Sequence, residues 1–525
     1  MAVLSPSLSD QGDPRRTRSY RPWSAFVFLC AFALAAMHVA TLASVPAPFV
    51  DELWYLSRAI GWLRDGRVMG AVDAGVIQEF DGYWTYFPVA STLYQAAFVY
   101  VFGETVLAMR LSSFLAGAWL LAAVYWIGCW VWERPSGVLS AFLVSAASYF
   151  VYSSHLGRQD MLVAALGYTA LALFLWDGGH RWALKSLLAG LLLGIAVEIH
   201  PNGSIFGAGL LACSCVRFGR GVLRAGQNWA VLAGVSLGLA GYLWLHVLPY
   251  PDTFLGINRV FFGATHTPPL ISGSAEAWIT SAEAAWTMYS IGLTTRLPLV
   301  SAGGLLVMFA GGSRGRMLGA WLLGLVLGAV GLMRNHHPYY IVLLDPTADI
   351  LCGYLVARLW FDRNWRGRWV ARARLGASVL CIAPVVWMLP SFSTSALTDF
   401  ELVQHRLQTA LPPESSVMAS PVYWLAVRDH LFWNWGQLAY WRAYRPGDSL
   451  RDAVAAYKPD YFVVDSEMEQ FLGDESDLEG LSHFQRFYFM SRSQMDDLLR
   501  ARGTLISESE TSTYGSMRIY KLRWD

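Results

Sequence analysis

Long apolar segments recur along this chain and constrain its fold more than any other feature. A transmembrane helix needs about 20 mostly apolar residues, because each residue adds only about 1.5 Å to a helix that must cross the hydrocarbon core. We expect about eleven such helices, at residues 24–44, 107–132, 137–154, 161–176, 187–199, 203–216, 231–248, 297–311, 317–333, 339–360 and 377–389. The chain is therefore predicted to be an α-helical polytopic membrane protein.

The composition agrees with a membrane protein. Hydrophobic residues make up 55% of the chain and charged residues 15%, whereas a soluble domain carries about 25% charged residues. A chain of 525 residues with so little charge cannot cover its surface in water, which excludes an ordinary soluble enzyme and a disordered chain. Its net charge of +1 provides no field that attracts phosphates, so we expect no nucleic-acid partner.

Basic residues in the loops predict the orientation of the helices, because cytoplasmic loops carry an excess of Lys and Arg. The basic segments all fall on one side of the predicted bundle: the N-terminal tail, 1–22, and the loops near 134, 181–185, 217–224, 314–316 and 363–374. We therefore expect a transmembrane domain at 23–390. Its long loops, 45–104 and 249–296, and the C-terminal segment lie on the outer side.

The C-terminal segment, 391–525, differs from the rest of the chain. It is rich in acidic clusters and has the composition of a soluble segment. Short apolar runs at 417–420 and 461–466 follow turn-forming residues and are typical of buried strands. Residues 491–501 favour a helix, and 504–509 and 515–524 favour strands. We expect a small extracytoplasmic α/β domain. It carries no phosphate-binding loop, metal signature or nucleophile elbow, so a lid or binding platform is the plainer interpretation.

An acidic pair opens the first long outer loop. Asp51 and Glu52 lie shortly after the first apolar run, and the residues after them place apolar side chains at near-helical spacing. This pattern predicts an amphipathic helix in the membrane interface. The two carboxylates could simply cap that helix. Alternatively, they present a carboxylate to a lipid headgroup at the membrane surface.

A second acidic position lies at the outer mouth of a predicted span. Asp160 immediately precedes the run at 161–176, and Arg158 lies two residues before Asp160. A charge at that depth is costly unless it is paired or lines a wet cavity, although an Asp at a helix start is also an ordinary cap. Two acidic sites at one surface raise the prospect of a shared cavity.

Further candidates cluster at the same predicted surface and suit an anionic headgroup, because imidazoles, guanidinium groups and phenols all donate hydrogen bonds to phosphate. They are Arg334, His336, His337, Tyr339 and Tyr340 before a late span, His200 and Asn202 in a short turn, and Arg296 at another span mouth. Each also has a plain structural interpretation, since interfacial Tyr and Arg commonly anchor helices. No third ligand follows the His pair at zinc spacing.

Taken in order, these residues resemble the GT-C (C-type) fold of integral-membrane glycosyltransferases, in the broad group of protein O-mannosyltransferases, lipid A aminoarabinose transferases and RgtA/B/C/D-like transferases. The resemblance lies in the Asp51–Glu52 pair, the FGETVLAMRLSSFLAG segment, the Arg158-x-Asp160 motif and the HHPYY segment before a late span. It extends over residues 26–355, and it rests on order and spacing rather than on one motif.

The resemblance implies an inverting glycosyltransferase of the bacterial cytoplasmic (inner) membrane. Such an enzyme moves a hexose or pentose from a polyprenyl-phosphate donor to a hydroxyl group of a lipid, glycan or protein acceptor on the outer face. Asp51 is then implied as the general base, and Asp160 would orient the acceptor or stabilise positive charge on the sugar. No cofactor is implied with certainty. The sequence leaves the need for a divalent metal undecided, because Asp and His could ligate one although no spacing compels it.

One departure concerns the lipid phosphate. Aminoarabinose transferases carry a Lys in the segment that matches YWTYFPVAS, where this chain has Thr85 or Tyr86. The phosphate contact is therefore expected from Arg158, Arg296, Arg334 or His337, and the departure favours the RgtA/B/C/D-like group.

Two other classes of function remain as alternatives. A multi-pass transporter or lipid flippase would place ionisable residues or broken helices near the membrane midplane, whereas most charges here lie at the predicted helix ends. A receptor with an outer ligand-binding domain gives no reason for the paired acidic sites.

Overall fold

The computed structural model describes residues 31–73, 88–176, 181–264, 268–293, 303–304, 307, 312–361, 367, 372, 376, 386, 396–474, 476, 478, 481 and 483–524. The chain divides into two compact units, Met1–Thr41 and Leu42–Asp525. The described part of the first unit is a short apolar helix, Ala31–Thr41. The second unit contains a helical bundle and a C-terminal domain, residues 396–524.

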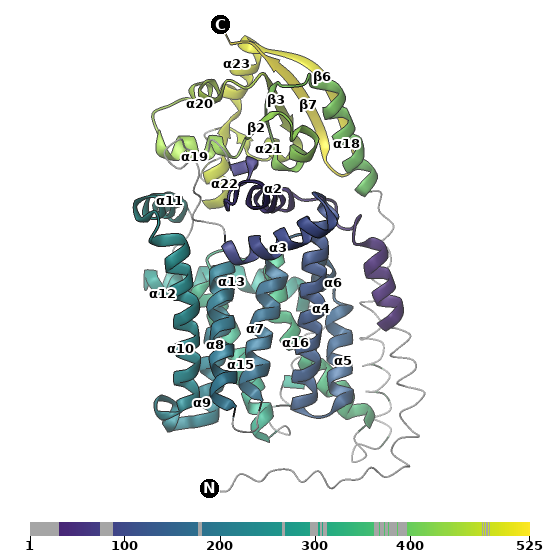
Figure 1. The fold of residues 1–525 in the computed structure, drawn as a ribbon, viewed down its shortest axis with the longest axis vertical. Helices are drawn as coiled ribbons and strands as arrows, with labels where there is room; N and C mark the ends of the chain where they lie inside the picture. The colour runs from purple at the N-terminus through teal and green to yellow at the C-terminus, as the bar shows by residue number, and fades with distance from the viewer. Residues whose placement is uncertain are drawn as a thin grey trace. The chain divides into compact units, whose positions relative to one another are not determined.

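Apolar helices make up the bundle (Figure 1). They are α4 (Val106–Val131), α5 (Arg134–Ser145), α6 (Ser148–His155), α7 (Asp160–Leu175), α8 (Trp182–Ile199), α9 (Ser204–Phe218), α10 (Gly226–Tyr242), α13 (Ala275–Leu293), α15 (Gly312–Leu332) and α16 (Ile341–Phe361). Short turns of 3-10 helix, η3 (Pro201–Gly203), η4 (Gly219–Arg224) and η6 (Pro338–Tyr340), and a π-helical turn, η5 (Leu243–Val247), extend or precede them.

Among the described residues, six helices are long and apolar enough to cross a membrane, or up to seven if the bent pair α5 and α6 is one span. The expected number of about eleven is not confirmed. The run at 137–154 is broken at Ala147, whose backbone is extended, and its halves bend by 65°. Helix α7 has only 16 residues and falls short of a full span. The runs at 297–311 and 377–389 lie largely outside the described residues.

Close approach of two helices explains part of the glycine content of the bundle. A Cβ atom added to Gly194 on α8 would lie 2.8 Å from the Cα atom of Gly238 on α10. One at Gly190 would lie 1.9 Å from the carbonyl oxygen of Val231. Small residues let helices pack backbone to backbone where lipid provides no hydrophobic driving force, so these glycines fix the α8–α10 pair.

Helix α2 (Val50–Asp65) lies between the bundle and the C-terminal domain, next to α3 (Val89–Phe102) (Figure 1). The expected amphipathic helix is thus present. The apolar side chains of one face, Leu53 and Leu56 among them, are fully buried in a core shared with Val422 and Tyr423 of the C-terminal domain. Protein, rather than lipid, covers that face, because the C-terminal domain folds back onto it.

Shorter elements complete this layer. They are η1 (Ala71–Asp73), α11 (Pro251–Ala264) and α12 (Pro269–Ser272). Asp73 accepts hydrogen bonds from Nε and Nη2 of Arg58 at 2.7 and 2.6 Å, and both side chains are buried. This ion pair ties the segment after α2 back to the helix.

The C-terminal domain is built on a five-stranded sheet of order β2-β1-β3-β7-β6. Strands β1 (Ser416–Ala419), β2 (Leu431–Asn434) and β3 (Tyr461–Asp465) run parallel, whereas β7 (Gly515–Leu522) and β6 (Gly503–Thr511) form an antiparallel hairpin beside β3. The other elements are α18 (Ala396–Ala410), η8 (Pro421–Val427), α19 (Gln437–Tyr444), α20 (Leu450–Tyr457), α21 (Ser466–Glu469), α22 (His483–Tyr488), α23 (Arg492–Arg502) and the short pair β4 (Leu472–Gly473) and β5 (Met490–Ser491).

The small α/β character of this domain is confirmed. The runs at 417–420 and 461–466 contain β1 and β3, 491–501 contains α23, and the last two runs contain β6 and β7. Strand β2 was not expected, because its four residues alternate in burial beside a Trp-rich turn and give no long apolar run.

Candidate functional site

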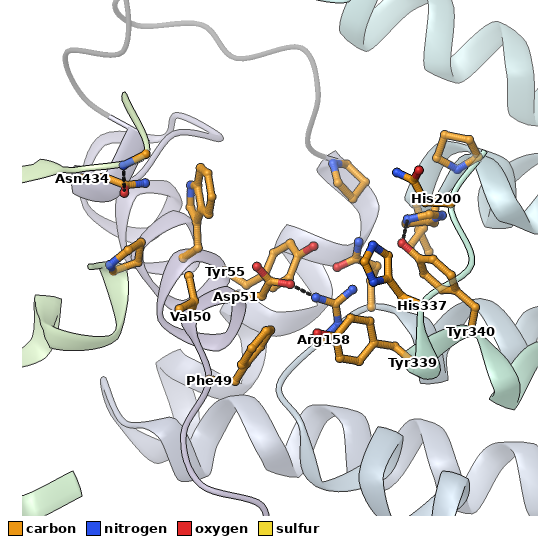
Figure 2. A pocket seen from close by; sticks show the side chains of 18 of the residues that line it. Phe49, Val50, Asp51, Tyr55, Arg158, His200, His337, Tyr339, Tyr340 and Asn434 are labelled. Carbon is orange, nitrogen blue, oxygen red and sulfur yellow. Dashed lines mark hydrogen bonds and ion pairs between the residues drawn. The ribbon is translucent and has the colours of Figure 1, made fainter. Parts of the chain in front are cut away.

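A cavity of about 350 Å³ lies where α2, the adjoining ends of the bundle helices and the C-terminal domain meet (Figure 2). Of the candidates named from the sequence, its lining includes Asp51, Arg158, His200, His337, Tyr339 and Tyr340. Residues that are far apart in the chain therefore share one concave site.

Arg158 joins the two acidic positions. Its Nη1 atom forms an ion pair with Oδ2 of Asp51, and its Nε atom donates to Oδ2 of Asp160 at 2.7 Å. The Asp51 side chain is 31% exposed and faces the cavity, whereas that of Asp160 is 3% exposed and lies behind the guanidinium group. Asp51 is thus the carboxylate of this group that a ligand in the cavity can reach.

An aromatic ring holds the other face of the guanidinium group. The Cζ atom of Arg158 lies 4.1 Å from the ring centroid of Tyr339, which in turn stacks on Tyr152 with a centroid distance of 5.8 Å. A cation over an aromatic face is attracted by the ring quadrupole. Arg158 is therefore fixed by two carboxylates and a ring, and it fixes Asp51 in turn.

Glu52 has a different environment from its neighbour Asp51. It is 1% exposed, accepts hydrogen bonds from Nε and Nη2 of Arg110 at 2.9 Å each, and accepts another from the Gly157 amide at 2.8 Å. It also accepts from the Phe49 amide at the start of α2. It does not line the cavity. The structure places Glu52 where α2, α4 and the Arg158 loop are joined.

Imidazole groups also line the cavity. The His200 Nδ1 atom accepts from the Asn202 amide at 3.1 Å, and Nε2 lies 3.2 Å from the Tyr340 hydroxyl group (Figure 2). Burial lowers the pKa of His200 to about 4, and burial together with the charge of Arg158 lowers the pKa of His337. Both rings are therefore neutral at neutral pH. Among the described lining residues, Arg158 is the one Arg or Lys side chain.

The remaining sequence candidates lie elsewhere. His336 lies 3.3 Å from the Ser281 hydroxyl group, and burial lowers its pKa to about 4. Asn202 is buried in η3, and neither it nor Arg334 or His336 belongs to the cavity lining. Arg296, Thr85 and Tyr86 lie outside the described residues.

Sequence reasoning missed several residues of the site. Glu198, at the end of α8, lines the cavity, accepts from the Val89 amide at 2.7 Å and pairs with His246 Nε2 at 2.8 Å. Ionisable groups within apolar helices are a general signal of function, and that signal was available here. The lining residues from the C-terminal domain, including Asn434, Trp435 and Glu467, gave no such signal.

No group of three or more His, Cys, Asp or Glu side chains in the part of the chain described above is arranged to hold a metal ion. The cavity instead offers one carboxylate beside a guanidinium group, neutral imidazoles and phenols. Such a set can accept a proton from a hydroxyl group and can bind an oxyanion.

No protein-family model matches the sequence, and no curated protein matches it. Solved structures do match. ArnT from Cupriavidus metallidurans, in a crystal structure bound to undecaprenyl phosphate, is 13% identical with a TM-score of 0.63, and the match covers 95% of this chain and 98% of that one. The oligosaccharyltransferase AglB from Archaeoglobus fulgidus, in complex with an inhibitory peptide and a dolichol-phosphate, is 12% identical with a TM-score of 0.57, covering 94% of this chain and 80% of that one.

Both structures are GT-C fold glycosyltransferases. The resemblance inferred from the sequence is confirmed at the level of the fold: this chain has the GT-C fold over nearly its whole length.

Proposed function

We propose that the chain is a membrane glycosyltransferase that moves a sugar from a polyprenyl-phosphate donor to a hydroxyl group of an acceptor, with Asp51 as the general base. The observation that carries the proposal is the Asp51 carboxylate, partly exposed to the cavity and held by the buried Arg158. The similar folds of two transferases solved with polyprenyl phosphates support this donor class.

The role of Asp51 follows from its position. A general base must lie within hydrogen-bond reach of the proton that it removes, and Asp51 lines the cavity beside other hydrogen-bonding groups. The ion pair with Arg158 orients the Asp51 carboxylate, and Asp160 holds the guanidinium group from behind. Asp160 and Glu52 are thus proposed as positioning residues rather than as groups that touch substrate.

The proposed reaction is a displacement at the anomeric carbon with inversion. The acceptor oxygen forms a bond to that carbon while its proton passes to Asp51, and the bond between the carbon and the phosphate oxygen breaks. The electron pair leaves with the polyprenyl phosphate. A phosphate is a good leaving group, so hydrogen-bond donors and cations that stabilise its charge suffice without a general acid. Arg158 and the neutral His337 and Tyr340 are the cavity donors proposed for this role.

A lipid-linked donor also explains the place of the site. The cavity lies at the ends of membrane-length helices, where a polyprenyl chain can remain in the bilayer while its headgroup enters. We propose that this end of the bundle is the outer face of a bacterial cytoplasmic membrane, in agreement with the basic residues in the opposite loops.

The test is transfer or donor hydrolysis by the purified full chain with a panel of polyprenyl-phosphate sugars. The substitution Asp51→Asn should lower the rate by about 10²- to 10⁴-fold, the usual contribution of a general base. A matched control is Asp65→Asn, which changes an exposed carboxylate at the other end of α2 and should leave the rate unchanged.

Two results would contradict the proposal. One is the absence of turnover by the wild-type protein with every donor in the panel. The other is full activity of a folded Asp51→Asn variant, which would remove Asp51 from the chemistry. Inversion is checked separately from the anomeric configuration of the product.

A further inference from the structure

The parallel part of the C-terminal sheet ends at the cavity. Strands β1, β2 and β3 run in the same direction, so their carboxyl ends lie on one edge of the sheet. The residues that follow each strand belong to the cavity lining: Pro421 after β1, Asn434 to Gly436 at the end of β2, and Glu467 after β3.

The connections between these strands make this edge a favoured place for a ligand. The chain passes from the central strand β1 to β2 on one side, and then to β3 on the other side of β1. Where the winding of a parallel sheet reverses in this way, the loops separate and leave a crevice at the carboxyl ends of the strands. Here that crevice opens into the same cavity as Asp51.

Glu467 brings a carboxyl group to this crevice in a defined position. Its Oε2 atom accepts from the Ser420 hydroxyl group at 2.7 Å. The preceding Asp465 is buried, caps α21 by accepting from the Met468 amide at 2.8 Å, and so fixes the turn that carries Glu467. Burial and the neighbouring charge of Asp465 raise the pKa of Glu467, so the group can both donate and accept hydrogen bonds over a wide pH range.

Aromatic rings form the adjoining wall. Trp435 lies 5.6 Å from Phe471 and 6.2 Å from Tyr488, measured between ring centroids, and all three rings line the cavity. The Asn434 side chain braces this turn, because its Oδ1 atom accepts from the Gly436 amide at 2.9 Å (Figure 2). These contacts place Trp435 in the wall of the cavity.

We propose that this edge is the acceptor subsite of the cavity and that it binds a carbohydrate, with Glu467 and Trp435 as the residues that select it. Pyranose rings present hydroxyl groups around their rim and C–H groups on their faces, which match a carboxyl group beside a cluster of aromatic faces. The term acceptor rests on the glycosyltransferase function proposed above, whereas the binding of carbohydrate does not.

The residues at this edge favour a glycan over a lipid or a peptide as the acceptor. A lipid acceptor would be matched by apolar side chains without a fixed carboxyl group, and a peptide acceptor would be matched by main-chain donors and acceptors along a free strand edge. In the parallel part of this sheet, the side chains after the strand ends, rather than a strand edge, face the cavity.

The experiment is binding of the labelled full chain, in lipid nanodiscs, to an array that carries immobilised oligosaccharides and peptides. We expect the wild type to bind a subset of the glycans. The substitution Glu467→Ala should weaken that binding about tenfold, which corresponds to about 1.4 kcal/mol and to the loss of a hydrogen bond to a neutral group.

The matched control is Glu469→Ala. Glu469 lies on the same short helix, pairs with Arg518 and does not line the cavity, so its removal should leave glycan binding within about twofold of wild type by the small worth of such pairs. Thermal melts of all variants show whether each is folded. A folded Glu467→Ala variant with unchanged glycan binding, an array profile dominated by peptides, or a wild type that binds no glycan would each overturn the proposal.

This test is separate from that of the proposed function. The Asp51→Asn variant should bind the glycans as the wild type does while losing turnover. Glycan binding that depends on Glu467, in a protein that turns over no polyprenyl-phosphate sugar, would refute the transferase function and keep the carbohydrate site. Turnover of a polyprenyl-phosphate sugar without any glycan binding would keep the transferase function and refute the carbohydrate site.

Discussion

Asp51 and Glu52 are neighbours in the sequence, yet they belong to two different arginine–carboxylate centres. Glu52 and Arg110 form a closed pair whose side chains are at most 1% exposed, and the guanidinium group also donates to the Leu42 and Ala43 carbonyl groups. Asp51 and Arg158 form an open pair at the cavity wall, with Asp51 31% exposed. Successive helical residues point about 100° apart, so one turn of α2 supplies both centres.

The comparison teaches how similar chemistry serves two purposes. In the closed pair, hydrogen bonds satisfy both groups and join three segments of the chain, so its contribution is to the folded structure. In the open pair, one carboxylate keeps a face toward the cavity, so it can accept a proton. Exposure, rather than residue type, separates the two centres.

The largest expected effect comes from breaking the closed pair. The substitution Glu52→Ala leaves the Arg110 charge buried without its partner, and removal of one member of a buried pair typically costs about 3–5 kcal/mol. We expect a marked fall in melting temperature and in the yield of folded protein, measured in detergent. Glu104→Ala, which removes a partly exposed partner of Arg64 and Arg428, should cost no more than about 1 kcal/mol. Equal losses for the two variants would show that the closed pair has no special role.

The next largest effect is expected at Asp160, the carboxylate that holds Arg158 of the open pair. In Asp160→Asn, Arg158 loses its buried anchor, and misplacement of a catalytic group by about 1 Å can lower a rate by up to about 10²-fold. We expect a fall in kcat with little change in KM. Asp160→Glu should restore part of the rate. A loss confined to KM would instead assign Asp160 to substrate binding.

A smaller effect is expected from the ring under Arg158. The substitution Tyr339→Leu removes an attraction of about 0.5–2 kcal/mol, which corresponds to a loss of transfer rate of about 2- to 30-fold. Tyr339→Phe keeps the ring and should retain most of the rate. If Tyr339→Phe is as slow as Tyr339→Leu, the hydroxyl group, and not the ring face, is what matters.

The smallest effect is expected at the carboxyl pair of the C-terminal domain, Asp465 and Glu467. Because the folded protein raises the pKa of Glu467 above its ordinary value near 4.5, the neutral form is favoured by folding. The resulting stability is complete below the ordinary value and is lost as the pH rises through the raised one. We therefore expect the melting temperature of Glu467→Gln to exceed that of wild type by an amount that grows from pH 5 to pH 9. A difference that does not vary with pH would contradict this account.

Much of the fold was predictable because it depends on local patterns. The apolar runs located α4, α8, α9, α15 and α16, and short runs between turns located most strands of the C-terminal sheet. The number of spans was not predictable in this way. Whether an apolar run forms one straight helix or a pair bent by 65°, as at α5 and α6, depends on what packs against it.

The candidate site was predictable only in part. Charged residues at the ends of apolar runs stand out, so Asp51, Arg158 and the His337–Tyr340 segment were found. The sequence treated Asp51 and Glu52 alike, because both begin the same helix. It gave no reason to join Glu467 to them, since more than 400 residues of chain separate Asp51 from Glu467.

The sequence by itself determined that most of the chain lies in a bilayer, that it is helical, and which charged residues lie at the ends of the apolar runs. These properties follow from hydropathy and charge along the chain. Only the tertiary structure decided which carboxylate is buried and which faces the cavity, and that the C-terminal domain forms one wall of the site. The reason is physical: exposure and ion pairing are set by groups that meet in space, and Arg110, Arg158 and the end of β3 come to α2 from distant parts of the chain.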